Sequence, residues 1–228
     1  MPITFYVPNA IFVPSGSPAH WYDAGQILGL SDNDPVVTWP DLVVADDLTQ
    51  STPADRPVYK ATGGGGKSLP YVAGDPTTQK VLTVPYSVAL THPVTIFVVS
   101  APITIGNSEF MIASHTNRGC ELSQNGNWVT YSGNAVDWSA ATGRVNGVWS
   151  IFTLTCNGAS STLRVNGVAL SAPQDIGAVG MDGLTLGAAV ANKWPNIASD
   201  IAWGEIIVYD GVESPAANEG GLASKWGL

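Results

Sequence analysis

Aromatic and amide side chains gather in the segment from residue 125 to residue 138. Asn127, Trp128 and Tyr131 lie there within five residues of one another. An aromatic ring can stack on the C–H face of a sugar, and an amide can pair with its hydroxyl groups. Trp128 and Tyr131 differ by three positions, so they point to opposite faces of a regular strand, and at least one ring is expected in the core. The candidate carbohydrate-binding residues are therefore Asn127, Trp128, Tyr131 and, in the polar loop 192–196, Trp194.

Hard oxygen ligands occur together at Asp32, Asn33 and Asp34, directly before Pro35. Calcium prefers such oxygens, but a full site needs six or more of them. The same residues before a proline are also ordinary turn formers. Two interpretations stay open. The segment is either a calcium site with Asp32 and Asp34 as ligands or a turn without metal. No cofactor other than calcium is expected.

Two further patterns are expected to carry no chemistry. The segment 61–68 fits a relaxed phosphate-loop pattern, but Leu69-Pro70 follows where a phosphate loop needs a helix. We therefore expect a mobile glycine hairpin loop and no nucleotide site. The three histidines, His20, His92 and His115, have no partner at metal-ligand spacing, so each is expected to be structural or exposed.

The two cysteines, Cys120 and Cys156, are too few for a disulfide framework. They lie on segments that we interpret as strands. One bridge and two free buried thiols are both compatible with the sequence, and the second interpretation is favoured.

Composition and charge exclude several classes of protein. The chain has 228 residues, of which 12% are charged, and a net charge of -9. It contains no run of Lys and Arg, so neither nucleic acid nor an anionic membrane surface is an expected partner. The long segment from Val81 to Glu109, which is uncharged before Glu109, contains prolines and is no spanning helix. The 25 glycines and 16 prolines favour short strands and many turns over long helices.

Period-two alternation of apolar and polar residues dominates the chain. We expect ten to twelve strands, among them segments 94–100, 152–156, 163–165 and 201–209, with a tight turn at Asn166-Gly167. One helix is expected over 216–226, because Ser214-Pro215 suits its start and Gly227 its end. The Gly220-Gly221 pair weakens the middle of that helix.

The domain organisation is simple. Residues 1–19 contain four prolines and are expected to form an extended arm that lies against its own sheet or against a neighbouring subunit. Residues 20–228 form one domain. Residues 1–5 lack the basic and apolar regions of a secretory signal, as expected for a protein that folds in a cytoplasm or one whose signal has been removed.

Several short motifs in a fixed order carry a family resemblance. They are Trp21-Tyr22-Asp23, segment 30–36, Trp39-Pro40-Asp41, Thr49-Gln50, Arg56-Pro57, and segments 95–99, 163–168, 201–210 and 222–228. Together they resemble LamG-like jelly-roll domains of the concanavalin A-like lectin/glucanase superfamily, which occur in phage virions and bacterial surface proteins. The sequence departs from the family pattern at 42–45 and 72–75. The resemblance implies an all-β jelly-roll sandwich of two antiparallel sheets with one short C-terminal helix.

The resemblance also bears on catalysis. Glucanases of this superfamily place carboxylates in the pattern Glu-x-Asp-x-x-Glu, and two of them act as nucleophile and general acid/base. The nearest match begins at Glu205 and ends at Asp210, with Ile207 in the middle position. One carboxylate cannot do both jobs, so the sequence predicts that the protein is not an enzyme. We expect Glu205 to be a buried carboxylate bonded to the backbone or to an arginine.

Three functions follow from these expectations. The first is a non-enzymatic phage virion protein, made in the host cytoplasm. It would be a capsid decoration or a tail or tail-tip component, present in many copies and docked to other virion proteins through residues 1–19. The alternative is an extracellular or cell-surface adhesin module that binds a glycan of the host surface. The third, disfavoured, is a glycoside hydrolase.

Overall fold

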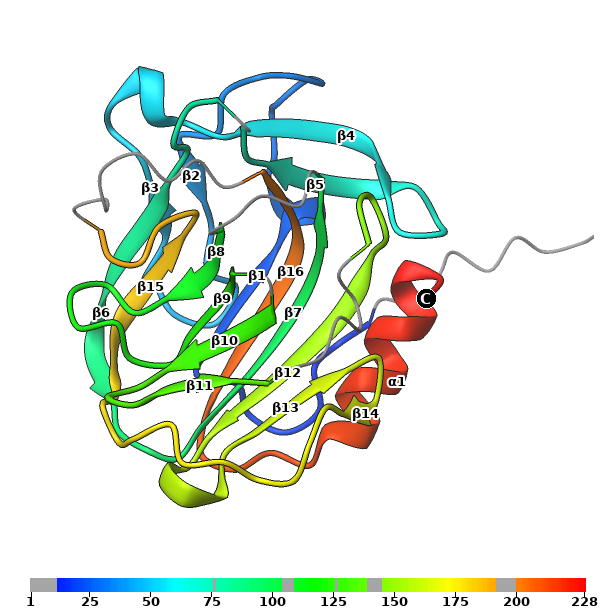
Figure 1. The fold of residues 1–228 in the computed structure, drawn as a ribbon. Helices are drawn as coiled ribbons and strands as arrows, with labels where there is room; N and C mark the ends of the chain where they lie inside the picture. Colours follow the sequence, from blue (N-terminus) through cyan, green and yellow to red (C-terminus); the bar gives the residue numbers. More distant parts are fainter. Residues whose placement is uncertain (1–11, 76, 104–108, 126, 139–144, 192–199) are drawn as a thin grey trace, which may run out of the picture.

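The computed structural model describes residues 12–75, 77–103, 109–125, 127–138, 145–191 and 200–228. Within these residues the chain forms sixteen strands, three short 3-10 helices and one α-helix. The strands make two antiparallel sheets that pack face to face around one core (Figure 1). The predicted all-β sandwich is therefore confirmed. The strand number exceeds the expected ten to twelve because several strands are only two or three residues long, too short to show a periodicity.

The first sheet has the order β14-β13-β12-β7-β16-β5-β4. Strand β1 also belongs to it and pairs with the part of β16 that does not pair with β5. Its long central strands, β7 (Val94–Pro102) and β16 (Ile201–Asp210), are buried along nearly their whole length. The other strands are β1 (His20–Asp23), β4 (Val58–Gly64), β5 (Leu69–Ala73), β12 (Ser150–Cys156), β13 (Thr162–Val165) and β14 (Val168–Ala169).

The second sheet has the order β11-β10-β9-β8-β15-β6-β3-β2. Trp39, Leu48, Met111 and Trp128 are among the fully buried side chains that it contributes to the core. Its strands are β2 (Thr38–Trp39), β3 (Leu48–Thr49), β6 (Leu82–Leu90), β8 (Glu109–Ala113), β9 (Glu121–Asn125), β10 (Asn127–Tyr131), β11 (Ala135–Asp137) and β15 (Met181–Leu186).

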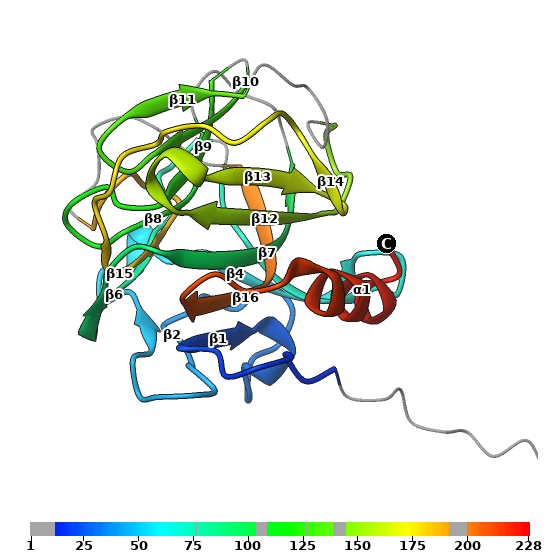
Figure 2. The same ribbon diagram turned by 90° about the horizontal axis from the view of Figure 1, so that it is seen from below.

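The outer face of the first sheet carries a second apolar cluster. Phe97 and Ile207 point outward from β7 and β16 and pack with Leu222 and Trp226 of helix α1 (Pro215–Trp226). Because both faces of these strands are covered, their sequences are continuous apolar runs rather than alternating ones. Figure 2 shows α1 beside the hairpin formed by β4 and β5.

Helix α1 begins and ends close to the predicted residues. Pro215 opens the helix, and Gly227 ends it in a left-handed conformation with φ of 70°. The C-terminal Trp226 is fully buried and lies so close to Gly204 that a Cβ there would be 2.2 Å from the ring. The strand register shifts at this glycine, which makes room for the indole.

The predicted turns also appear. Asn166 and Gly167 have φ of 49° and 81°, as a tight hairpin between β13 and β14 requires. The glycine-rich segment turns between β4 and β5, so no helix follows it and a phosphate loop is excluded. The loop packs against the end of α1, where the Lys67 amide donates to the Trp226 carbonyl at 3.3 Å.

The described part of the N-terminal arm lies against its own domain. The Ser15 amide donates to Asn218 Oδ1 at 2.8 Å, and the Tyr209 hydroxyl donates to the Ser15 carbonyl at 2.5 Å. The Ala19 amide donates to the Val208 carbonyl at 2.8 Å, and Phe12 packs on the second apolar cluster. Of the two partners expected for the arm, residues 12–19 therefore use their own sheet and helix. Among the described helices, none has the length and apolarity needed to cross a membrane.

Candidate functional site

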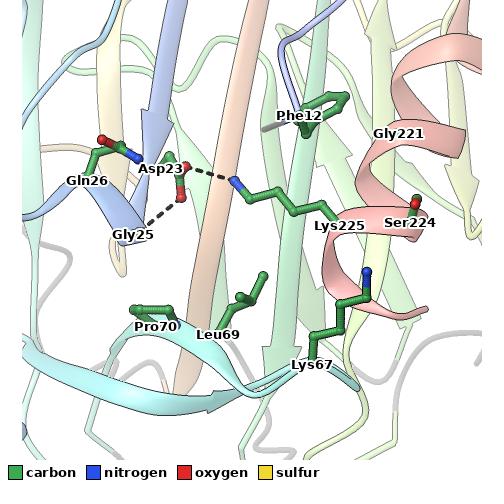
Figure 3. A pocket seen from close by; sticks show the side chains of 10 residues that line it. All are labelled: Phe12, Asp23, Gly25, Gln26, Lys67, Leu69, Pro70, Gly221, Ser224 and Lys225. Atoms are coloured by element: carbon green, nitrogen blue, oxygen red, sulfur yellow. Dashed lines mark hydrogen bonds and ion pairs between the residues drawn. The ribbon is translucent and has the colours of Figure 1, made fainter. Parts of the chain in front are cut away.

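A pocket of about 510 Å³ opens between helix α1, the β4–β5 hairpin and the short helix η1 (Ala24–Gln26). Figure 3 shows Lys225 reaching from α1 across the pocket toward Asp23 at the end of β1. The residues that line it are Phe12, Asp23, Gly25, Gln26, Lys67, Leu69, Pro70, Gly221, Ser224 and Lys225.

Lys225 is held by two carboxylates from neighbouring strands. Its Nζ donates to Asp23 Oδ2 and to Glu205 Oε2, each at 2.8 Å. Asp23 and Glu205 are paired directly across β1 and β16, which brings both carboxylates to the same ammonium group. Asp23 and Lys225 line the pocket, whereas Glu205 is fully buried behind them.

Two indoles complete the surroundings of Glu205. Trp21 Nε1 donates to its Oε1 at 2.8 Å, and Trp226 Nε1 donates to its Oε2 at 2.9 Å. Burial raises the pKa of Glu205, although Lys225 favours its charged form. Burial would lower the pKa of Lys225, but Glu205 and Asp23 outweigh it and raise that pKa. The expectation of a buried, bonded Glu205 is confirmed, with indoles and a lysine as its partners in place of backbone or arginine.

The pocket wall combines apolar and polar chemistry. Leu69 and Pro70 form one apolar wall, and the half-buried ring of Phe12 forms another (Figure 3). Gln26 and Lys67 are exposed at the rim and offer amide and ammonium groups. A volume of this size with a few convergent polar groups suits a small polar organic ligand. Apolar walls can take the C–H face of a sugar while the rim pairs with its hydroxyl groups.

Trp128, a predicted sugar-contacting residue, lies in the core instead. Its side chain is fully buried. Its ring packs edge to face against the ring of Phe152 in the other sheet, and the two ring centroids are 4.6 Å apart. The prediction that Trp128 contacts a carbohydrate is therefore wrong. The physical reason is the one that the three-residue spacing indicated, since Trp128 points inward when Tyr131 points outward.

Tyr131 and Asn127 lie on the outer face of β10 and already have partners. The Arg118 guanidinium lies 4.6 Å from the centre of the Tyr131 ring, and Asn127 Nδ2 donates to Asp137 Oδ2 at 3.1 Å. Arg118 is itself ion-paired with Glu121 at 2.7 Å. A sugar would have to displace Arg118 to stack on the ring face that Arg118 covers. Both residues stay predictions, and Trp194 lies outside the described residues.

Asp34 is joined to the backbone of its own turn, and Asp32 is joined to the backbone of strand β4. Asp32 Oδ1 accepts from the Ala61 amide at 3.0 Å, and Asp34 Oδ2 accepts from the Ser31 amide at 2.7 Å. Asn33 between them adopts φ of 70°. The Asp34 contact and the positive φ of Asn33 are typical of the turn interpretation. Calcium binding by Asp32 and Asp34 stays a prediction.

A cluster that the sequence did not reveal joins His92, Cys120 and Cys156. Both thiols are free and buried, and the ligand atoms of the three residues lie within 4.8 Å of one another. His92 Nε2 is 3.7 Å from Cys120 Sγ. Burial would raise the pKa of Cys120, but hydrogen bonds with Cys156 and His92 lower it to about 7. The expectation that His92 has no partner of metal-ligand type is therefore wrong.

Sequence reasoning missed these groupings because their members are far apart in the chain. His92 and Cys156 meet because β7 and β12 pair with Cys156 opposite Val94. Asp23 and Lys225 are separated by 202 residues. No spacing rule links such positions, and only the order of strands in the sheet would have found them.

Comparison with known proteins identifies the fold. No protein-family model matches the sequence, and no curated protein matches it. Among solved structures, Trypanosoma rangeli sialidase in complex with sialic acid is similar with a TM-score of 0.64 and 10% identity, over 93% of this chain and 34% of that one. The chain thus spans about a third of the length of that sialidase. Domain 4 of AbnA, an extracellular GH43 arabinanase from Geobacillus stearothermophilus, in complex with arabinotriose, has a TM-score of 0.55 and 12% identity, over 72% of this chain and 80% of that one.

The chain therefore shares the β-sandwich fold of these solved chains. The comparisons also correct one prediction. We predicted no enzyme because Ile207 takes the position of the middle carboxylate, yet the similar solved chains belong to a sialidase and an arabinanase, which are enzymes. Identities of 10% and 12% carry the fold alone, so the correction removes the exclusion and assigns no reaction.

Proposed function

We propose that this protein is a carbohydrate-binding domain whose ligand enters the pocket between α1, the β4–β5 hairpin and η1. The observation that carries the proposal is the pocket itself, where Phe12, Leu69 and Pro70 face a rim that includes Gln26 and Lys67. The similarity to solved chains in complex with sialic acid and with arabinotriose supports the choice of a sugar over other small polar ligands.

The pocket is preorganised for such a ligand. The Asp23–Lys225–Glu205 ion pairs fix the floor, so a sugar need not order those side chains on binding. Lys225 is compensated by two carboxylates, so it offers the ligand a positioned polar surface rather than an uncompensated charge. Gln26, Lys67 and Ser224 stay exposed and can donate to hydroxyl groups.

The virion or cell-surface location remains part of the proposal. Many copies on one assembly would add their weak single-site affinities, as multivalent sugar binding requires. No described contact distinguishes a capsid from a tail or an adhesin, so those finer assignments stay predictions.

The test is a titration of the purified protein with a glycan panel that includes sialic acid and arabinotriose, followed by calorimetry on the best ligand. Gln26→Ala with Lys67→Ala should weaken binding by about tenfold or more, since each lost hydrogen bond costs about 0.5–1.5 kcal/mol. The unfolding midpoint should stay unchanged, because both side chains are exposed.

The matched control is the double variant Asn127→Ala with Tyr131→Ala on β10. If the β10 double variant loses sugar binding while the pocket double variant keeps it, the binding site lies on β10, and the proposal that the sugar binds in the pocket is refuted. A panel with no saturable binding would refute the proposed function. Release of reducing ends, measured in the same solutions, would show that the bound sugar is also cleaved.

A further inference from the structure

A Cys–Cys–His group occupies one end of the sandwich, away from the proposed sugar pocket. Cys120 directly precedes β9, Cys156 ends β12, and His92 lies two residues before β7. The antiparallel pairing of β7 with β12 sets Cys156 opposite Val94, which brings the imidazole to the thiol. The three groups therefore come from both sheets and meet because of the fold, not because of local sequence.

The spacing of the donor atoms suits a tetrahedral metal ion. A zinc ion with bonds of about 2.3 Å to sulfur and about 2.0 Å to nitrogen holds its sulfur and nitrogen ligands about 3.6 Å apart. His92 Nε2 and Cys120 Sγ are 3.7 Å apart, and all three donor atoms lie within 4.8 Å of one another. Only small side-chain movements would close the remaining distances.

A hydroxyl oxygen lies next to the imidazole of the group, and it also donates to the Val179 carbonyl. Ser132 Oγ, from the residue after β10, is 2.9 Å from His92 Nε2 and 3.3 Å from the Cys120 amide. The other ring nitrogen, His92 Nδ1, is buried and has no hydrogen-bond partner among the described residues. The polar contacts of this ring are thus directed to the thiols and to Ser132.

The charge of the group also fits its buried position. Cys120 and Cys156 are both fully buried, where an uncompensated ion would be costly. Two thiolates and a neutral imidazole around a divalent cation give a complex with no net charge. Thiolate and imidazole together select zinc over the hard cations that carboxylates would take.

We propose that His92, Cys120 and Cys156 bind one zinc ion, with Ser132 as the nearest fourth ligand. This site joins loops of both sheets and is structural in kind, because its ligands are buried and it lies apart from the sugar pocket. It is independent of the proposed sugar binding, so either proposal can fail alone.

The experiment uses the full chain, reduced and stripped of metal with a chelator, and titrated with Co²⁺ without oxygen. Thiol titration of the unfolded protein first establishes that both cysteines are reduced. The expected result is one cobalt per chain, with thiolate-to-cobalt charge-transfer absorption and the intense visible bands of a tetrahedral site, which Zn²⁺ then removes. Zinc should also raise the thermal unfolding midpoint.

His92→Gln should weaken cobalt binding by more than about 100-fold, because losing even an outer partner of a ligand costs 10–100-fold. Its control is His115→Gln, since His115 is also half-buried but bonds to Thr83 outside the cluster. Cys120→Ser should likewise weaken cobalt binding and reduce the charge-transfer absorption, because only the Cys156 thiolate remains. Folded, reduced wild-type protein without that band overturns the site, and so does a cobalt affinity in His92→Gln or Cys120→Ser that equals that of wild type.

Discussion

Glu205 shows how one side chain joins three separate parts of the chain. Its two oxygens accept from the indoles of Trp21 and Trp226 and from Lys225. A carboxylate can accept from all these donors, but a carboxamide has only one accepting oxygen. Glu205→Gln therefore forces an N–H group against a donor, and we expect a loss of about 2–3 kcal/mol in unfolding free energy.

Urea denaturation measures this loss. The control is Glu213→Gln, the same change in the loop that follows β16, which should stay within about 0.5 kcal/mol of wild type. Equal midpoints for the two variants would mean that the Glu205 contacts add nothing to stability. The buried role of Glu205 could be predicted from its place in an apolar strand. Its partners could not, since Trp21 lies 184 residues away.

Asp182 provides a pH dependence of known sign. Burial disfavours its charged form, but hydrogen bonds from Ser114 and Thr116 outweigh burial and lower the pKa of this carboxyl. The pKa of Asp182 is lower in the folded protein than the value of about 3.9 in the unfolded chain. Its ionised carboxylate therefore stabilises the fold above about pH 3.9, and this stabilisation is lost as the pH falls through the folded-state pKa. Asp182→Asn should therefore be less stable than wild type near pH 7, with a difference that shrinks in acid.

The measurement is a series of urea midpoints for both proteins from neutral pH to below the unfolded pKa. Asp210→Asn, at the exposed end of β16, corrects for the general effect of acid on the fold. A difference between wild type and Asp182→Asn that stays constant with pH would contradict the role of the ionised Asp182.

At the scale of elements, two adjacent glycines of α1 have opposite roles. A Cβ at Gly220 would meet nothing within 4 Å, whereas one at Gly221 would lie 2.2 Å from the Phe12 ring. Gly220→Ala should stabilise the protein by about 0.5–1 kcal/mol, the usual gain from alanine over glycine inside a helix. Gly221→Ala should be less stable than Gly220→Ala, because it must displace Phe12.

A double-mutant cycle with Phe12→Ala, read by thermal and urea unfolding, separates the two effects. In the Phe12→Ala background, Gly221→Ala should become as stabilising as Gly220→Ala. Additive effects of Phe12→Ala and Gly221→Ala would mean that the close approach has no energetic consequence. The sequence indicated only that this glycine pair weakens the helix. It could not show that one glycine is required by a residue of the arm.

The elements themselves were largely predictable. Alternation and β-branched runs located β7, β12, β13 and β16, and the proline and glycine signals located α1. What local patterns could not give is the pairing order, because β16 pairs with β7 along its whole length and with β5 and β1 at two separate stretches. The candidate pocket and the thiol cluster both depend on that order, which is why neither was foreseen.

At the scale of the whole molecule, the described part of the arm belongs to the fold. Deletion of residues 1–11 leaves the described contacts of residues 12–19 in place, and we expect it to keep the unfolding midpoint of wild type. Deletion of residues 1–19 removes Phe12 from the apolar cluster and leaves the buried Asn218 and Tyr209 without their bonds to Ser15. Each such loss costs about 1–3 kcal/mol, so the longer deletion should be clearly destabilised in urea.

Equal stability of the two truncations would contradict this, and would make residues 1–19 a separable arm. If the prediction holds, only the shorter deletion can test the proposed docking to virion proteins, because the longer one also damages the domain and its pocket wall.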